Sequence, residues 1–290
     1  MLDMTLFGKY SDSHSPTIVL EGGLGNRMRV AAAAYTMSER TGLPMRVLWV
    51  AQWGMPCRFD NLFSPCCQAA TGFTLRDAEG MERWLYARSR PANLYIPRIV
   101  QKLRFSNIIR SPQIYHLNQA GFDYETWFRR GSNLMFAYRH FCEWTPELLS
   151  MLFIPLPCIS SAADSLCEPF TSHTIGCHIR RTDNRQSIEE SPTELFIETL
   201  DRECDSHSDI RIFLATDDEP TKQLLLQRYG ASRLIVHHHH ATRNNADGIR
   251  DALTEMIALS RTSCIYGTAG STFSEIAALW GSIPRHVLTL

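Results

Sequence analysis

Two consecutive arginines, Arg180 and Arg181, follow an apolar run over 174–179, and Thr182 and Asp183 come directly after them. Arginine is a permanently charged planar fork that matches phosphate oxygens two at a time. We predict a buried strand over 174–179, and open α/β sheets bind ligands at the carboxyl ends of their strands. The stretch therefore indicates an anion site, although a surface ion pair beside a turn has the same composition.

A glycine-rich stretch, GGLGNR at 22–27, follows an apolar, β-branched run over 17–21. Gly23 and Gly25 let backbone amides approach a phosphate at the start of a helix, which we expect over 27–40. The side chains of Asn26 and Arg27 add donors. A purely structural tight turn is the alternative interpretation.

The same stretch does not fit a dinucleotide-binding fingerprint. The third glycine of that pattern would fall on Met28, and no acidic residue follows Val50 to hold a ribose. We therefore reject an NAD-dependent oxidoreductase.

Two further polar stretches follow predicted strands, ATDD at 215–218 and GTAGSTFS at 267–274. Ser271 and Thr272 precede a predicted helix over 272–280, where amides and hydroxyls can bind an anion. Thr272 and Glu275 also fit a capping box. Asp217 and Asp218 could hold a metal or orient an arginine, but arginines can neutralise a diphosphate without a cation. We expect metal-independent chemistry.

Strands alternate with helices along most of the chain, which predicts parallel sheets. In the first half, we expect strands over 17–21, 45–50 and 134–141. In the second half, we expect strands over 174–179, 210–215, 233–236, 263–267 and 285–288, with helices over 192–204, 219–229, 246–260 and 272–280. Pro155 and Pro157 favour an extended connection between two domains, 1–155 and 156–290.

The overall composition excludes several classes of protein. A chain of 290 residues is about two domains at roughly 150 residues each. The net charge of −1 offers no global basic field for nucleic acid. No run approaches the ~20 apolar residues of a spanning helix. The nine cysteines lack zinc spacing, and we interpret them as reduced thiols.

Two composition-biased stretches do not belong to the predicted site. Seven basic residues lie from Arg83 to Arg110, which we interpret as a solvated helical face or, alternatively, a site for an acidic or phosphorylated acceptor. Four histidines, His237 to His240, are interpreted as an exposed loop, because neighbours on an extended chain cannot all bind one metal.

The four polar stretches, with HIRRTD at 178–183 nearly intact, resemble the motifs of the fucosyltransferase superfamily. The similarity covers 17–50 and 174–281. It implies a GT-B-like α/β fold, with two Rossmann-like domains facing a central cleft. It also implies an inverting enzyme that uses GDP-β-L-fucose and requires no metal or other cofactor.

The resemblance also implies roles for individual residues. His178 would lie near the guanine, Arg180 would hold the β-phosphate, and Arg181 would support the site. Glu255 falls where the α1,6 enzymes carry an aspartate near the guanine, and Thr268 would contact donor phosphate together with Ser271.

A base is also needed for the acceptor hydroxyl. Glu189 and Glu190 lie on the predicted loop after the arginines, and we take Glu189 as the candidate. Asp183 is better suited to orienting Arg180 or the loop backbone. The predicted donor-binding set is Gly23, Gly25, Asn26, Arg27, His178, Arg180, Arg181, Asp217, Asp218, Glu255, Thr268, Ser271 and Thr272, with Arg180, Asp183 and Glu189 as catalytic residues.

Two other functions remain open, a glycosyltransferase with another nucleotide sugar and an inactive GDP-binding protein on this scaffold. The expected partners are the sugar donor and a glycan or lipid-linked glycan acceptor, with peripheral membrane association open and no nucleic acid. The amino terminus shows neither a secretory signal nor a Golgi-type anchor, so we expect a bacterial, cytoplasmic enzyme.

Overall fold

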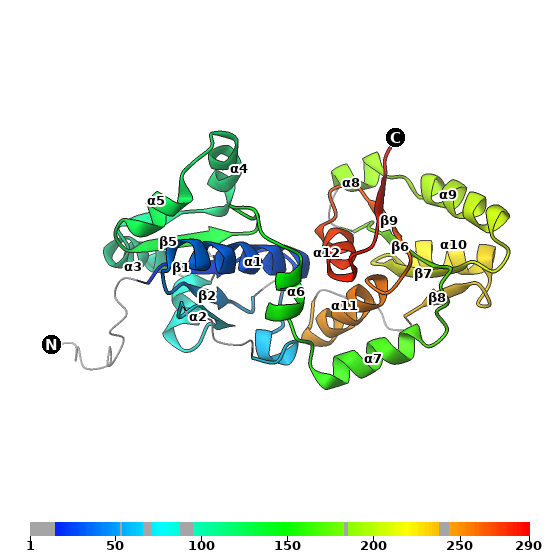
Figure 1. The fold of residues 1–290 in the computed structure, drawn as a ribbon, viewed down its shortest axis with the longest axis horizontal. Helices are drawn as coiled ribbons and strands as arrows, with labels where there is room; N and C mark the ends of the chain where they lie inside the picture. Colours follow the sequence, from blue (N-terminus) through cyan, green and yellow to red (C-terminus); the bar gives the residue numbers. More distant parts are fainter. Residues whose placement is uncertain (1–14, 53, 66–70, 88–94, 183–184, 238–243) are drawn as a thin grey trace.

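The computed structural model describes residues 15–52, 54–65, 71–87, 95–182, 185–237 and 244–290. Its strands form two separate five-stranded sheets, one in each half of the chain (Figure 1). All strand pairs in both sheets are parallel, as the alternation of strands and helices predicted.

The first sheet has the strand order β3-β2-β1-β5-β4, so that β1 lies at its centre. Its strands are β1 (Thr17–Leu20), β2 (Arg46–Trp49), β3 (Thr74–Asp77), β4 (Asn107–Ile109) and β5 (Asn133–Ala137). Residues of β1 alternate between the two faces. Ile18 and Leu20 pack with α1 (Leu24–Thr41), whereas Val19 packs with α2 (Met81–Tyr86) and with Phe105 after α3 (Ile96–Arg104).

The second sheet has the order β10-β9-β6-β7-β8, with β6 at its centre. Its strands are β6 (Thr174–Ile179), β7 (Arg211–Thr216), β8 (Leu234–Val236), β9 (Ile265–Thr268) and β10 (Arg285–Leu288). The helices of this half are α8 (Arg185–Glu190), α9 (Thr193–Ser206), α10 (Glu219–Tyr229), α11 (Ala246–Leu259) and α12 (Thr272–Gly281).

The predicted elements of the second half agree with the structure to within two residues at each end. The prediction was poorer between 52 and 150, where several short elements carried no clear periodic signal. These are a 3-10 turn at Phe59–Asn61, β3, α2, α3, β4, α4 (Ser111–Gln119) and α5 (Tyr124–Arg129). α1 also begins three residues earlier than predicted, because Gly25 and Asn26 belong to its first turn.

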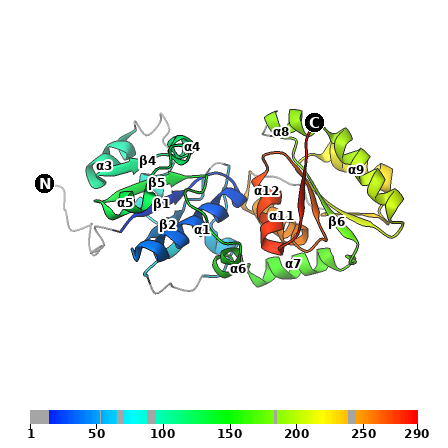
Figure 2. The same ribbon diagram turned by 45° about the horizontal axis from the view of Figure 1, so that its top comes forward.

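The connection between the halves consists of α6 (Glu147–Leu152), an extended stretch and α7 (Pro157–Cys167). The extended stretch pairs with the first half, because Leu156 donates its backbone N–H to Leu62 and Ser64 donates to Ile154. α7 lies against α11 of the second half (Figure 2). No helix among the described residues is both long enough and apolar enough to cross a membrane.

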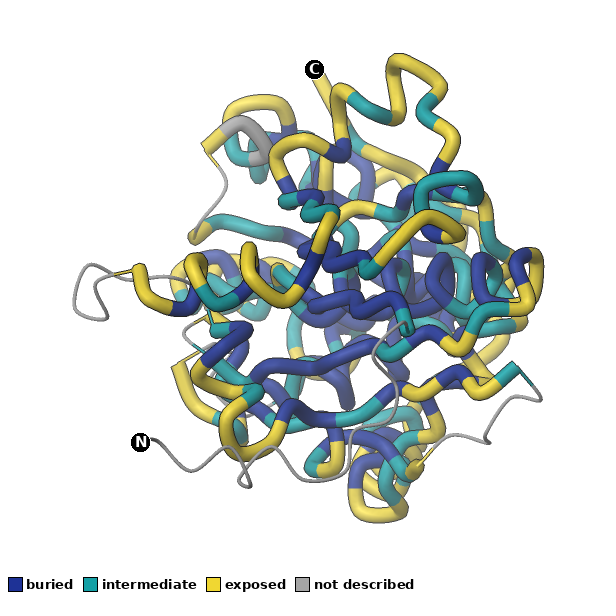
Figure 3. The backbone as a smooth tube through the Cα atoms, turned by 90° about the vertical axis from the view of Figure 1, so that its left-hand side faces the viewer, coloured by how far each residue is buried: buried dark blue, intermediate teal, exposed yellow. Residues whose placement is uncertain are grey.

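One hydrophobic cluster runs through both halves. Met28 and Ala32 of α1 belong to it together with Met256 of α11 and Ile276 of α12. α1 and α12 are in direct contact between the two sheets (Figure 1). The buried backbone forms a continuous interior under an exposed surface (Figure 3). This packing fixes the amino-terminal end of α1 against that of α12.

Candidate functional site

The first turns of α1 and α12 meet at Gly25. A Cβ atom at Gly25 would lie 2.7 Å from the backbone oxygen of Thr272, so only glycine allows this approach. Gly23, the N-cap of α1, has no side chain, and the side chain of Ser271, the N-cap of α12, accepts no capping hydrogen bond. Two sets of first-turn amides, each at the positive end of a helix dipole, therefore converge.

A polar cluster joins the two halves beside this contact. The Thr272 hydroxyl donates to Asn26 Oδ1 at 3.1 Å, and Arg29 Nη2 donates to the same oxygen at 2.7 Å. Arg29 Nη1 lies 3.8 Å from Glu275 Oε2, across the two halves. The predicted capping box was therefore wrong, because Ser271 is the N-cap and Glu275 faces Arg29. The ion pair between Arg29 and Glu275 was not predicted from the sequence.

The end of β6 is fastened to β9 through Thr268. The Thr268 hydroxyl, which is fully buried, donates to the His178 carbonyl and accepts from the Arg180 N–H, both at 3.1 Å. The His178 ring stacks on Phe273 of α12, with centroids 5.0 Å apart. Its Nδ1 lies 3.4 Å from the Ser271 hydroxyl. Arg180 thus leaves the carboxyl end of β6 close to the start of α12.

Arg181 is committed to the protein itself. Its Nε donates to the Thr193 hydroxyl at 3.0 Å, Nη1 to the Arg180 carbonyl at 3.0 Å and Nη2 to the Ser191 carbonyl at 2.7 Å. Burial lowers the pKa of Arg181, against the attraction of Asp218, Glu194 and Asp217. The guanidinium therefore braces the loop after β6.

The paired acids after β7 also have partners within the protein. Asp217 accepts from the Arg181 N–H at 2.7 Å and from the Thr182 hydroxyl at 2.6 Å. Asp218 is the N-cap of α10 and accepts from the N–H and hydroxyl of Thr221 at 2.9 and 2.6 Å. The two carboxylates hold the arginine loop and a helix start in place.

Arg27 points into the first half, with only 1% of its surface exposed. Its Nε donates to the Gly22 carbonyl and its Nη2 to the Val50 carbonyl, both at 3.0 Å. The guanidinium lies 4.8 Å from the centroid of the Trp49 ring. Burial lowers the pKa of Arg27 to about 9. Arg27 is thus placed to support the turn at Gly22.

Glu255 lies in α11 and pairs with His237, which follows β8 and is mostly buried, so the prediction of an exposed histidine loop was wrong for this residue. Glu255 Oε1 and His237 Nδ1 are 3.7 Å apart. Burial raises the pKa of Glu255, and the attraction of His237 and Lys222 opposes this effect. This pair lies at the carboxyl edge of the same sheet that carries Arg180.

The remaining predicted residues are placed less centrally. Glu189 lies on the short helix α8, not on a loop as predicted, and its exposed carboxylate accepts from Arg185 Nε at 2.7 Å. Asp183 and His238–His240 lie outside the described residues. Among the residues that the structure describes, no group of three or more His, Cys, Asp or Glu could hold a metal ion.

Two further residues near these strand ends were not predicted. Ser191 is fully buried, accepts from the Ala269 N–H at 2.9 Å and donates to the Leu288 carbonyl at 2.5 Å, which joins the arginine loop to β9 and β10. Glu21 directly follows β1 and accepts a hydrogen bond from the Ser111 hydroxyl. Its position next to the glycine stretch was the signal that could have identified it.

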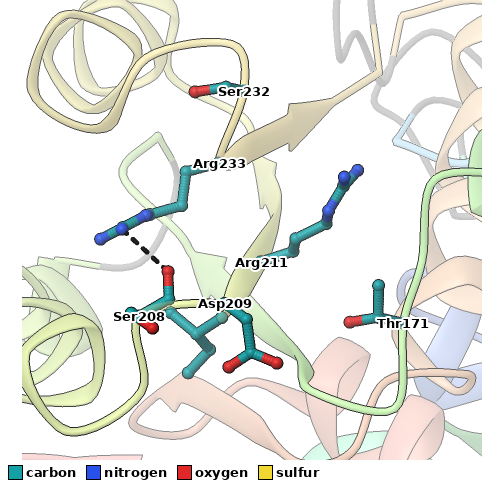
Figure 4. A pocket seen from close by; sticks show the side chains of 7 residues that line it. Thr171, Ser208, Asp209, Arg211, Ser232 and Arg233 are labelled. Atoms are coloured by element: carbon teal, nitrogen blue, oxygen red, sulfur yellow. Dashed lines mark hydrogen bonds between the residues drawn. The ribbon is translucent and has the colours of Figure 1, made fainter.

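A separate pocket of about 380 Å³ lies at the opposite, amino-terminal edge of the second sheet (Figure 4). Arg233 donates to the Ser208 carbonyl at 3.1 Å, and the Arg211 side chain extends in another direction. Because this pocket lies at the edge away from Arg180, it is not part of the candidate site.

No protein-family model matches the chain, and no curated protein matches it in sequence. Solved structures do match in fold. The NodZ α-1,6-fucosyltransferase soaked with GDP-fucose aligns with a TM-score of 0.60 at 17% identity, covering 92% of each chain. Another structure of this enzyme, from Bradyrhizobium, gives a TM-score of 0.58 at 16% identity and covers 91% of this chain and 92% of that one.

POFUT1 in complex with GDP-fucose aligns with a TM-score of 0.57 at 10% identity, covering 97% of this chain and all of that chain. A mutant of Arabidopsis thaliana FUT1 in complex with GDP also gives 0.57, at 15% identity, covering 97% of this chain and 71% of that chain. The chain therefore has the two-sheet α/β fold of these fucosyltransferases, which confirms at the level of the fold the resemblance that its motifs predicted.

Proposed function

We propose that the chain is a glycosyltransferase that moves L-fucose from GDP-β-L-fucose to a hydroxyl of a glycan or lipid-linked glycan, with inversion. The observation that carries this proposal is the convergence of two helix starts at Gly25, next to the strand end that bears Arg180. Two solved structures of the same fold were obtained with GDP-fucose, one by soaking and one as a complex. A diphosphate is the ligand that this arrangement of amides and arginine suits best.

In the proposed reaction, the acceptor oxygen bonds to the anomeric carbon while the bond from that carbon to the β-phosphate oxygen breaks. Negative charge grows on the departing GDP, and a preformed arginine and helix-start amides stabilise it without a metal. Arg180 supplies the direct contact in this proposal. Thr268 and Arg181 keep its backbone in place through their hydrogen bonds to its N–H and carbonyl, and Asp217 holds the N–H of Arg181.

The acceptor proton needs a carboxylate within hydrogen-bond reach. We retain Glu189 as the proposed base, because α8 directly follows the arginine loop. Glu21 is a competing carboxylate at the carboxyl end of the central strand of the first sheet.

We further propose a GT-B arrangement in which the donor occupies a cleft between two domains, 1–155 and 156–290. His178 and the Glu255–His237 pair would bind on the guanine side, while Gly23, Gly25 and Asn26 would face the phosphates. Arg27, which is buried, would act by supporting the Gly22 turn. A bacterial, cytoplasmic setting remains a prediction from the sequence.

Donor identity can be tested by thermal shift with GDP, GDP-fucose, GDP-mannose, UDP-glucose and NAD, with and without EDTA. A ligand at 100 times its dissociation constant adds about 2.7 kcal/mol to stability, which is readily visible. We expect stabilisation by GDP and GDP-fucose that EDTA does not change. A response to UDP-glucose or NAD alone would contradict the proposal, and binding of GDP without transfer or hydrolysis would support an inactive GDP-binding protein.

Arg180→Ala should lower kcat for fucosyl transfer by about 100- to 1000-fold, as loss of a charged contact to the leaving group does. Arg202→Ala, which removes an exposed arginine from α9, is the matched control and should keep activity. Retained turnover in Arg180→Ala would contradict the proposal that Arg180 contacts the leaving GDP.

The base can be tested with Glu189→Gln, its neighbour Glu190→Gln and Glu21→Gln, measuring kcat and GDP affinity separately. The base variant should lose turnover by about 100-fold or more and keep GDP affinity. Loss in Glu21→Gln alone would move the base to the first half of the chain.

A further inference from the structure

Helix α3 carries an apolar stripe on its outward face. Ile96, Ile99 and Leu103 lie at i, i+3 and i+7, so that they share one side of the helix. They are 46%, 57% and 83% exposed. Large aliphatic side chains that are this exposed on one helix face indicate a surface that binds a membrane or another protein.

The inward face of α3 is polar at its centre. Gln101 is 1% exposed, donates from Nε2 to the Leu85 carbonyl at 2.6 Å and accepts from Arg110 Nη2 at 2.8 Å. The helix therefore buries a satisfied glutamine and turns its leucine outward. A helix that only packs against a sheet would bury its leucine and expose its glutamine, so this pattern is the reverse of the usual one.

Positive charge surrounds the stripe. Arg98, Lys102 and Arg104 are exposed on the same helix. Between Arg83 and Arg110 the sequence has seven basic residues and no acidic one, in a chain whose net charge is −1. Helix α3 thus carries three exposed cations and no acidic residue, whereas the molecule as a whole is close to neutral.

Helix α2 extends the same surface. It is in contact with α3 and packs on the same face of the first sheet. Its Met81 and Trp84, at i and i+3, are 69% and 38% exposed, and Arg83 between them is also exposed. Two neighbouring helices therefore both present apolar side chains next to cations.

We propose that the outer face of α2 and α3 docks on an anionic lipid surface. Exposed Ile, Leu, Met and Trp flanked by Lys and Arg are the composition of helices that lie in a membrane interface. The cations complement anionic headgroups, and each contributes when it comes within a Debye length of the surface. α1 covers the opposite face of the sheet, so a lipid surface against α2 and α3 would not cover the region where α1 meets α12.

The proposal can be tested by co-sedimentation of the full chain with phosphatidylglycerol-rich vesicles and with pure phosphatidylcholine vesicles. We expect binding to the anionic vesicles that weakens as salt rises from about 0.1 to about 1 M, because the Debye length falls from about 10 to about 3 Å. Lys102→Glu combined with Leu103→Ser should reduce this binding at least about tenfold.

A matched double variant, Arg202→Glu with Leu224→Ser, makes the same two types of change on exposed residues of α9 and α10 and should bind like the parent. Unchanged melting temperatures show that both variants fold. Equal binding of the parent and the α3 variant would overturn the proposal. So would an α3 variant that only changes oligomeric state, which would assign the face to a second copy of the chain.

Discussion

At the scale of single residues, Arg180 and Arg181 show how two adjacent arginines divide their roles. Adjacent residues of an extended chain point to opposite sides. Arg181 turns towards Thr193 and Ser191, where each of its three nitrogens has its own acceptor. Arg180 is fixed through its backbone. Arg181 therefore stabilises the loop from which the side chain of Arg180 extends.

This division predicts that Arg181→Ala acts mainly on stability. Loss of three charge-assisted hydrogen bonds from a half-buried guanidinium should cost roughly 2–3 kcal/mol in the free energy of unfolding by urea. Arg181→Lys should not restore it, because an ammonium cannot reproduce the fork. Arg202→Ala should stay within about 0.5 kcal/mol. An Arg181→Ala protein of parental stability would show that the bracing role is wrong.

Glu255 predicts a specific dependence of stability on pH. The folded protein raises its pKa above the ordinary value of 4.5, so the folded state holds the proton more tightly than the unfolded state. The contribution of this proton to the stability of the fold is fully present below pH 4.5 and is lost as the pH rises through the pKa of Glu255 in the folded state. Glu255→Gln should therefore raise the melting temperature at neutral pH and change it less at pH values near 4.5.

The measurement is a series of melting temperatures between acidic and neutral pH, with Glu198→Gln on the exposed side of α9 as control. The control should follow the parent curve. A constant difference in melting temperature between Glu255→Gln and the parent at all pH values would show that folding does not raise the pKa of Glu255.

At the scale of elements, the site depends on how closely α1 approaches α12. A side chain at Gly25 would meet the Thr272 oxygen at 2.7 Å and the Ile276 side chain at 3.3 Å, whereas a Cβ at Gly23 would meet nothing within 4 Å. Of these two glycines of one motif, only Gly25 is required by packing, and only the structure shows this difference.

Gly25→Ala should destabilise the protein by roughly 1–3 kcal/mol, because the added methyl forces the two helix starts apart. It should also weaken GDP binding, since the converging amides separate. Gly23→Ala should cost roughly 0.5–1 kcal/mol in stability, because alanine is a poorer N-cap than glycine, and it should leave GDP binding unchanged, since a Cβ there meets no neighbouring atom. Thermal melting and GDP titration of the pair measure both effects, and equal behaviour of the two variants would argue against the convergence.

At the scale of the whole molecule, the two halves are joined by a continuous apolar core as well as by polar contacts. Met28 and Ile276 come from opposite halves and belong to one buried cluster. Arg29 and Glu275 form an ion pair across the same boundary. Neither sheet can lose its packing without exposing apolar surface of the other.

We therefore expect calorimetric unfolding of the full chain as one cooperative transition, with equal calorimetric and van't Hoff enthalpies. GDP should shift this transition as a whole. Two separate transitions would mean that the halves unfold independently, in which case the core across the boundary contributes little to stability.

The sequence by itself determined the parallel sheet of the second half and the four polar stretches at strand and helix ends. Apolar runs, helical periodicity and glycine positions are local signals, and local signals suffice for these features. They failed between 52 and 150, where α3 buries Gln101 and exposes Leu103, so that its pattern points away from the core.

Only the tertiary structure decided which polar groups are committed to the protein. The partners that settle this are distant in sequence, as Thr272 is from Asn26 and Glu275 is from Arg29. Arg27 is buried against Val50, and Glu255 pairs with His237. A side chain's hydrogen-bond partners depend on how helices and sheets pack, and no spacing along the chain specifies that packing.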